Sequence, residues 1–170
     1  VRISSGRLAL EKLMRNPQKM ELRMSSNESV SAKGWILGDK MSDDEDVPRL
    51  FWIDLEMSGL YIEKEVIIEV AAIVTDFDFH ELASYSAVVK QPQSFIYNMD
   101  GWNSSHHTES GLIKLIPQGT EPAEVEKALI ALGNRFFPDD QPIILAGNSI
   151  ATDRQFINKY FPDFSYRLHY

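Results

Sequence analysis

A chain of 170 residues with 44% hydrophobic side chains can bury one packed core and has no room for two large domains. The absence of cysteine excludes disulfides and thiolate chemistry, and it is compatible with a reducing interior such as the mitochondrial matrix, cytosol or nucleus. No apolar run reaches the length of a membrane span, because Glu69 interrupts the apolar stretch at 66–74. We therefore expect a soluble protein.

The net charge of −8 is unevenly distributed. Residues 1–24 hold six basic and two acidic side chains, whereas residues 50–170 hold eight basic and seventeen acidic ones, a local charge of −9. A protein that grips long nucleic acid normally carries a basic stripe that displaces phosphate counterions. Any nucleic acid bound here should therefore be short or be held mainly through metal ions.

Residues 1–49 are predicted to form a flexible leader, because they lack sustained periodicity and carry a polar block at 25–34 and an acidic cluster at 43–46. The basic first half of this leader is typical of a mitochondrial presequence, and an untargeted disordered tail is the alternative. Residues 50–170 form the predicted folded domain.

Three strands are predicted at the start of this domain. They cover residues 50–56, the β-branched run at 66–75 and residues 82–90, with a turn at 57–60. The long apolar run at 66–75 is typical of a buried central strand. Short connections between the three strands favour antiparallel pairing.

Helices dominate the second half of the sequence. The predicted elements are a short helix at 110–116, an amphipathic helix at 120–133 with Thr120 as its N-cap, a buried strand at 143–147, and a helix capped by Asn148 and Ser149 that ends at Tyr160 before Pro162. Strands followed by this alternation indicate a mixed α/β layer fold.

Two carboxylates, Asp54 and Glu56, lie two residues apart in the first predicted strand. Side chains alternate along a strand, so both acids should share one face with Trp52, opposite Phe51 and Ile53. Neighbouring like charges stay ionised at low cost only when a cation or a proton lies between them. The pair therefore predicts a divalent-metal site or a general acid/base couple, with a strand end that simply reaches water as the alternative.

Asp153 lies one turn into the helix that follows the last predicted strand, and Ser149 lies at the start of that helix. Ligands in α/β sheets bind at such strand-to-helix junctions, where unpaired N–H groups can hold a phosphate. Asp153 can therefore meet Asp54 and Glu56 over one cleft. Three acids suit Mg²⁺ or Mn²⁺, and two such ions about 4 Å apart can promote phosphodiester hydrolysis. A first-turn acid favoured by the helix dipole is the alternative for Asp153.

Residues 50–170 resemble oligoribonucleases, a branch of the DEDD-type 3′-to-5′ exonucleases. The resemblance rests on three motifs, FWIDLEMSGL at 51–60, IIEVAAIVTD at 67–76 and LAGNSIATDRQF at 145–156. It implies a ribonuclease-H-like α/β fold, a three-layer mixed sheet with flanking helices, and a homodimer. It also implies that Asp54, Glu56 and Asp153 bind two Mg²⁺ or Mn²⁺ ions and that short RNA is hydrolysed to nucleoside 5′-monophosphates.

The same resemblance implies five substrate contacts. Leu60 and Trp102 would wedge against the bases, a role that suits an aromatic ring because every base has a face for stacking. A core position is the alternative for Trp102. His107 would lie near the substrate, with an ordinary surface histidine as the alternative, and Ser149 would hold the terminal phosphate. Tyr170 would reach across the dimer interface, with a frayed, idle terminus as the alternative.

The family also uses a His-x-x-x-x-Asp element, whose histidine is the general base and whose aspartate completes the metal site. No such spacing follows any of the four histidines of this sequence. The simplest interpretation is truncation, with the final fold elements beyond Tyr170 and weak or no activity in these 170 residues. Losing a general base typically removes about 10²- to 10⁴-fold of rate.

Two other functions are compatible with the sequence. The missing base suits a non-catalytic nucleotide-binding or dimerising module. The broad fold also suits a DNA-directed proofreading exonuclease, although the acidic charge and the Trp102 wedge argue against extended DNA.

Overall fold

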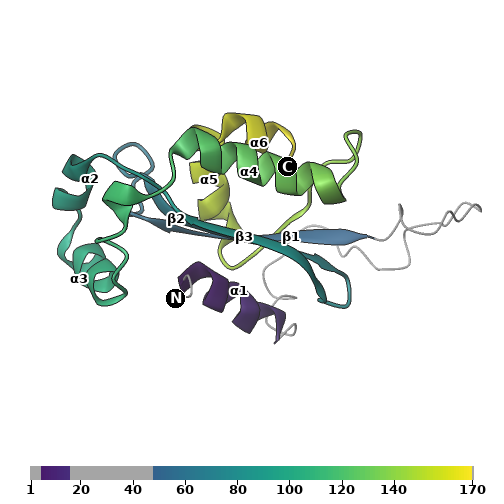
Figure 1. Ribbon diagram of the computed structural model, residues 1–170, viewed down its shortest axis with the longest axis horizontal. Helices are drawn as coiled ribbons and strands as arrows, with labels where there is room; N and C mark the ends of the chain where they lie inside the picture. The colour runs from purple at the N-terminus through teal and green to yellow at the C-terminus, as the bar shows by residue number, and fades with distance from the viewer. Residues whose placement is uncertain (1–4, 16–47, 170) are drawn as a thin grey trace, which may run out of the picture.

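The computed structural model describes residues 5–15 and 48–169 (Figure 1). Its centre is a four-stranded sheet in the order β3-β2-β1-β4. The strands are β1 (Arg49–Met57), β2 (Ile67–Asp76), β3 (Glu81–Val88) and β4 (Leu145–Ala146). The first three pair antiparallel and β4 joins β1 in parallel, so the sheet is mixed and the predicted antiparallel start is confirmed.

Helices surround this sheet. Their bounds are α1 (Ser5–Met14), α2 (Gln93–Tyr97), α3 (Gly101–Glu109), α4 (Pro122–Phe136), α5 (Ile150–Tyr160) and α6 (Pro162–Tyr166), with a 3₁₀ turn, η2, at Ile116–Gln118. Figure 1 shows α4, α5 and α6 over one face of the sheet and α1 against the other. Within the described ranges, none of these helices combines the length and apolarity needed to cross a bilayer.

The alternation of side chains along β1 divides the core into two layers. Phe51 and Ile53 belong to the larger cluster, which β1 shares with α4, α5 and α6. Trp52 faces the other way and packs with Ile73 of β2 and Leu10 of α1. This arrangement confirms the predicted faces of the first strand. It also places Asp54 and Glu56 on the side that carries α1.

Helix α1 lies within the predicted leader, yet it is packed on the sheet. Leu10 is fully buried, and Gly6 is buried directly over β1 and β2. Arg7 anchors the helix to the edge strand, where its guanidinium donates to Ser84 and Glu81 of β3 at 2.6 and 3.0 Å. The expectation of a flexible leader therefore does not hold for residues 5–14. Most of that segment, residues 16–47, lies outside the described residues.

The helix predicted at 110–116 is wrong, because the chain forms α3 earlier, at Gly101–Glu109. Asp100 sets its start, since its carboxylate accepts hydrogen bonds from the backbone N–H groups of Trp102 and Asn103, each at 2.9 Å. Residues 101–109 are mostly polar and lack an apolar stripe, so periodicity gives no sign of this helix.

Thr120 does not cap α4, because its backbone is paired with the end of the third strand. Its N–H donates to Val88 and its carbonyl accepts from Lys90, both at 2.8 Å. The helix begins instead at Pro122, whose fixed φ suits a first helical turn. The predicted strand at 143–147 shortens to β4 because Ile143 pairs with Leu168 instead.

Candidate active site

The site is built around the C-terminal half of β1. Asp54 and Glu56 are both partly buried on the face that carries α1. Asp54 lies against that helix, since a Cβ placed on Gly6 would be 2.9 Å from Asp54 Oδ2 and 3.1 Å from Ala71 Cβ. Only glycine lets α1 approach this closely. The acid pair is therefore not a strand end that simply reaches water.

Asp153 reaches the same strand from the other segment of the chain. It lies in the first turn of α5 and is 5% exposed. Its Oδ1 accepts a hydrogen bond from the backbone N–H of Leu55 at 3.0 Å. The side chain therefore contacts β1 at the residue that lies between the two other acids in the sequence. A solvent-facing first-turn acid does not describe this contact.

Two local features bring α5 to this position. A Cβ on Gly147 would lie 2.6 Å from the carbonyl oxygen of Ile53, so glycine is needed where the chain passes β1. Ser149 then adopts a left-handed conformation, with φ 57° and ψ 32°, and turns the chain into the helix. Ser149 is the N-cap by position, as predicted, but its side chain makes no capping hydrogen bond.

Glu69 is a fourth carboxylate at this site. It lies on β2 directly opposite Glu56, so the two side chains share one face, and it is 2% exposed. The sequence carried a signal for it, since Glu69 is the single charged residue within the apolar run 66–74. A charge held in such a run is costly unless it is paired, which marks the position as unusual.

Crowding of these acids changes their protonation. Burial, followed by the negative charges of Asp153, Glu56 and Glu69, raises the pKa of Asp54 to about 7. Burial also raises the pKa of Asp153 to about 6, although hydrogen bonds from the backbone N–H groups of Leu55 and Asp153 oppose the rise. A divalent cation would relieve the same repulsion that protons relieve here.

The donors available from these acids are carboxylate oxygens, which suit hard ions such as Mg²⁺ and Mn²⁺. Within the described ranges, the sets that bring one ligand atom from each of three side chains within 4.8 Å are Glu56, His106 and His107, and Asp76, Asp78 and His80. The trio of Asp54, Glu56 and Asp153 is not such a set. Closure of all three around one ion would therefore require side-chain rotation.

A cleft opens beside Glu56. It is lined by Glu56, Met57, Leu60, Trp102 and His107, among others. Leu60 is 75% exposed and Trp102 is 71% exposed, so the core alternative for Trp102 is wrong. Two large, exposed apolar side chains thus line the same cleft as the acid Glu56.

His107 is not a surface histidine, because it is 2% exposed. Its Nε2 donates to the carbonyl oxygen of Met57 at 3.1 Å, which ties α3 to the end of β1. The structure thus brings Glu56, Leu60, Trp102 and His107 to one cleft. Ser149 lies exposed at the start of α5, and Tyr170 lies outside the described residues.

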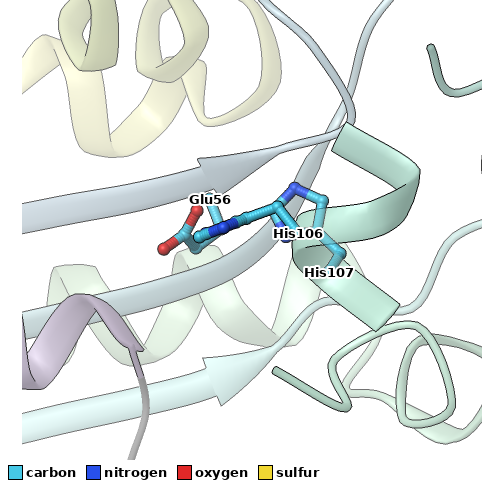
Figure 2. A group of neighbouring side chains, drawn as sticks. All are labelled: Glu56, His106 and His107. Carbon is cyan, nitrogen blue, oxygen red and sulfur yellow. The ribbon is translucent and has the colours of Figure 1, made fainter. Parts of the chain in front are cut away.

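His106 is a further residue of this region that sequence reasoning missed. Its ring stacks on Trp102, with the centroids 5.1 Å apart and the planes inclined by 7°. Figure 2 shows His106 and His107 extending from α3 toward Glu56 at the end of β1. A helix with no apolar stripe gives no sequence signal for this proximity.

The sequence of this chain is similar to sequences of known exonucleases and oligoribonucleases. The sequence family described as Exonuclease (RNase T) matches residues 51–170. The chain is 42% identical to the oligoribonuclease of Leifsonia xyli subsp. xyli over 72% of this chain and 59% of that protein. It is 41% identical to the mitochondrial oligoribonuclease of Homo sapiens over 72% of this chain and 52% of that protein, and 39% identical to the oligoribonuclease of Pseudomonas aeruginosa over 71% and 68%.

The chain thus spans between about half and two thirds of the length of these relatives. A solved structure of exonuclease I with a bound inhibitor superposes with a TM-score of 0.50 at 14% identity, covering 71% of this chain and 25% of that one. This likeness concerns the fold, which is the predicted ribonuclease-H-like mixed sheet with flanking helices. By sequence, the chain belongs to the oligoribonuclease branch of the exonuclease family.

Proposed function

We propose that this chain carries the acid site and the cleft of a metal-dependent 3′-to-5′ exoribonuclease that converts short oligoribonucleotides to nucleoside 5′-monophosphates. The observation that carries the proposal is the hydrogen bond that holds Asp153 against Leu55, the residue of β1 between Asp54 and Glu56, at the end of a strand whose Glu56 lines the cleft with Trp102. The names of the curated relatives support the same activity.

Asp54, Glu56 and Asp153 are the proposed ligands of Mg²⁺ or Mn²⁺. Bound ions of this kind activate water and stabilise the leaving oxygen of a phosphodiester. The residues fit such ions for two reasons: the donors are oxygen atoms, and Asp54, whose pKa is raised first by burial and then by neighbouring acids, lies close to other negative charges that a cation would offset. Glu69 adds to that charge from β2, so it favours a cation at the site without needing to touch it.

The cleft accounts for the proposed preference for short RNA. Leu60 and Trp102 can pack against base faces, which are sequence-independent contacts worth about 1–3 kcal/mol per stacked base. His107 is proposed to lie near the substrate, and Ser149 to help hold its terminal phosphate. The net charge of −9 over residues 50–170 discourages binding of a long polyanion beyond this cleft.

These 170 residues supply metal ligands and a base-stacking cleft but no His-x-x-x-x-Asp element. Because these residues lack the histidine that acts as general base in the family, we expect binding of metal and product to be easier to detect than turnover of RNA. The test is calorimetry of the 170-residue chain with a nucleoside 5′-monophosphate in Mn²⁺, followed by chromatography of a dinucleotide RNA incubated with the same ion. Binding with slow release of monophosphate supports the proposal.

Two outcomes would point elsewhere. Tight nucleotide binding with no detectable hydrolysis, equal in wild type and Asp153→Asn, would indicate a non-catalytic binding module. Faster degradation of long single-stranded DNA than of dinucleotide RNA would indicate a DNA-directed exonuclease. Absence of both binding and hydrolysis would refute the proposed function.

The proposal extends to assembly and compartment. The relative from Homo sapiens is named as mitochondrial, so the mitochondrion is the proposed compartment, with the cytoplasm and nucleus as the other outcomes of a localisation experiment. Unchanged import after removal of residues 1–24 would reject a presequence there.

A homodimer is also proposed, and sedimentation across a concentration series measures it.

A further inference from the structure

A mixed nitrogen and oxygen cluster lies beside the proposed acid site. One carboxylate oxygen of Glu56 and one ring nitrogen from each of His106 and His107 lie within 4.8 Å of one another (Figure 2). The residues come from two elements, the end of β1 and the helix α3. The cluster differs from the acid trio in chemistry, because two of its three donors are imidazole nitrogens.

Imidazole favours borderline transition ions, whereas Mg²⁺ and Mn²⁺ favour oxygen. Two histidines and one glutamate form a recurrent zinc ligand set that leaves a fourth position to water or substrate. Tetrahedral Zn²⁺ with bonds of about 2.0–2.1 Å needs ligand atoms roughly 3.3 Å apart. The ligand atoms lie at most 4.8 Å apart, so closing on the ion needs a contraction of roughly 1.5 Å at most, within reach of rotation of the half-buried Glu56 side chain and the exposed His106 side chain.

Both histidine rings are already oriented. The Nε2–H of His107 donates to the carbonyl oxygen of Met57, which fixes the ring against the end of β1. Such a hydrogen bond to a backbone carbonyl is the usual way in which proteins orient a metal-binding histidine. His106 is exposed, but its ring is held by the stack on Trp102 and lies 5.3 Å from the His107 ring, measured between centroids.

We propose that Glu56, His106 and His107 form a binding site for a borderline transition ion such as Zn²⁺, distinct in its ligands from the acid trio but sharing Glu56 with it. An ion held there withdraws Glu56 from Asp54 and Asp153 and occupies the wall of the cleft. Its effect on RNA hydrolysis, an inhibition, rests on the proposed function. The binding itself does not.

The test is titration of the metal-free 170-residue chain with Co²⁺ in excess Mg²⁺, followed by visible absorption and then by displacement with Zn²⁺. Four- or five-coordinate Co²⁺ with imidazole ligands absorbs far more strongly than the six-coordinate ion in water. We expect intense bands that Zn²⁺ abolishes. His106→Gln, at an exposed position, should retain the fold and weaken Zn²⁺ binding by about 10-fold or more.

His80→Gln is the matched control, because His80 is exposed and belongs to the other cluster, with Asp76 and Asp78. Its spectrum and Zn²⁺ affinity should equal those of the wild type. Glu56→Gln is the second variant and should lose the site as His106→Gln does. The proposal is overturned if wild type shows no intense bands, if His106→Gln binds Zn²⁺ as wild type does, or if His80→Gln abolishes binding.

The outcome is independent of the nuclease proposal, since absorption and affinity are measured without RNA. A chain that binds Zn²⁺ as expected but never hydrolyses RNA would retain this site and lose the proposed function. A chain that hydrolyses RNA with Mn²⁺ but gives no imidazole-dependent Co²⁺ spectrum would retain the function and lose this site.

Discussion

The carboxylate of Asp153 accepts the backbone N–H of Leu55 across 3.0 Å, and this contact holds an acid from α5 against the strand that carries Asp54 and Glu56. The contact uses only one oxygen lone pair of a buried carboxylate. The carboxylate has further oxygen lone pairs that can bind a metal ion, so it is a candidate ligand and not a structural hydrogen-bond acceptor alone.

Asp153→Asn separates these two roles. The amide oxygen can still accept the Leu55 N–H, so we expect the free energy of unfolding at pH 8 to be unchanged or higher, because a buried charge is lost. Affinity for Mn²⁺ should fall by about 10-fold or more, because a ligand is lost along with its charge. Calorimetry with Mn²⁺ and urea denaturation measure the two quantities. Asp140→Asn, on an exposed loop, should change neither.

The pH dependence of stability should follow from the two raised carboxyl pKa values. Folding raises the pKa of Asp54 from 3.8 to about 7 and that of Asp153 to about 6, so the folded chain holds protons that the unfolded chain has released. Stability from these groups is complete below about pH 4 and is lost as pH rises through 6 and 7. We expect the metal-free chain to lose about 2 kcal/mol or more of unfolding free energy between pH 5 and pH 8.

Urea denaturation at a series of pH values measures this loss. Asp54→Asn should flatten the profile, because it removes the group with the larger shift. Saturating Mn²⁺ should flatten it as well, since the ion binds the ionised carboxylates. Stability that rises between pH 5 and pH 8 would contradict the crowding of these acids.

Trp102 should contribute to ligand binding and not to folding. It is 71% exposed, so Trp102→Ala should change the free energy of unfolding by less than about 0.5 kcal/mol. Affinity for a dinucleotide should fall by about 1–3 kcal/mol through loss of one base stack. Fluorescence anisotropy of a labelled dinucleotide reports the affinity. Tyr97→Ala, at another exposed aromatic that is 78% exposed, is the control and should bind as wild type does.

Gly6 should be essential for the docking of α1. A side chain there meets Asp54 Oδ2 at 2.9 Å and Ala71 Cβ at 3.1 Å, so Gly6→Val should push α1 off the sheet or strain it at a cost of about 1–3 kcal/mol. Hydrogen exchange should then show lost protection over residues 5–15. Gly101→Ala is the matched control, because a Cβ at Gly101 meets nothing within 4 Å. Unchanged protection in Gly6→Val would contradict the close packing of α1 on Asp54.

Much of the fold follows from the sequence because apolar alternation in β1 and the long β-branched run of β2 are local patterns. The same alternation correctly placed Asp54 and Glu56 on one face, opposite Phe51. The position of Asp153 near the other acids followed from the strand-to-helix junction, a rule of α/β folds. These inferences needed no knowledge of distant contacts.

The features that sequence reasoning missed depend on distant contacts. Helix α1 is specified by the apolar face of the sheet that Leu10 covers, and that face does not exist until the strands pair. Thr120 does not cap α4 because its backbone forms two hydrogen bonds with residues at the end of β3. Helix α3 depends on a single cap, Asp100, in a polar segment. In these three segments, contacts with residues distant in the sequence determine the local conformation, and intrinsic helix or strand propensity does not.

The most direct test of the metal-site account is a crystal structure of the chain with Mn²⁺ and a nucleoside 5′-monophosphate, with Mn²⁺ located by anomalous scattering. The account predicts at least one ion within about 2.0–2.6 Å of carboxylate oxygens from Asp54, Glu56 and Asp153. It also predicts the base of the nucleotide near Trp102 or Leu60. Manganese bound only at Asp76 and Asp78, or an Asp153 carboxylate that contacts no ion while the nucleotide is bound, would contradict it.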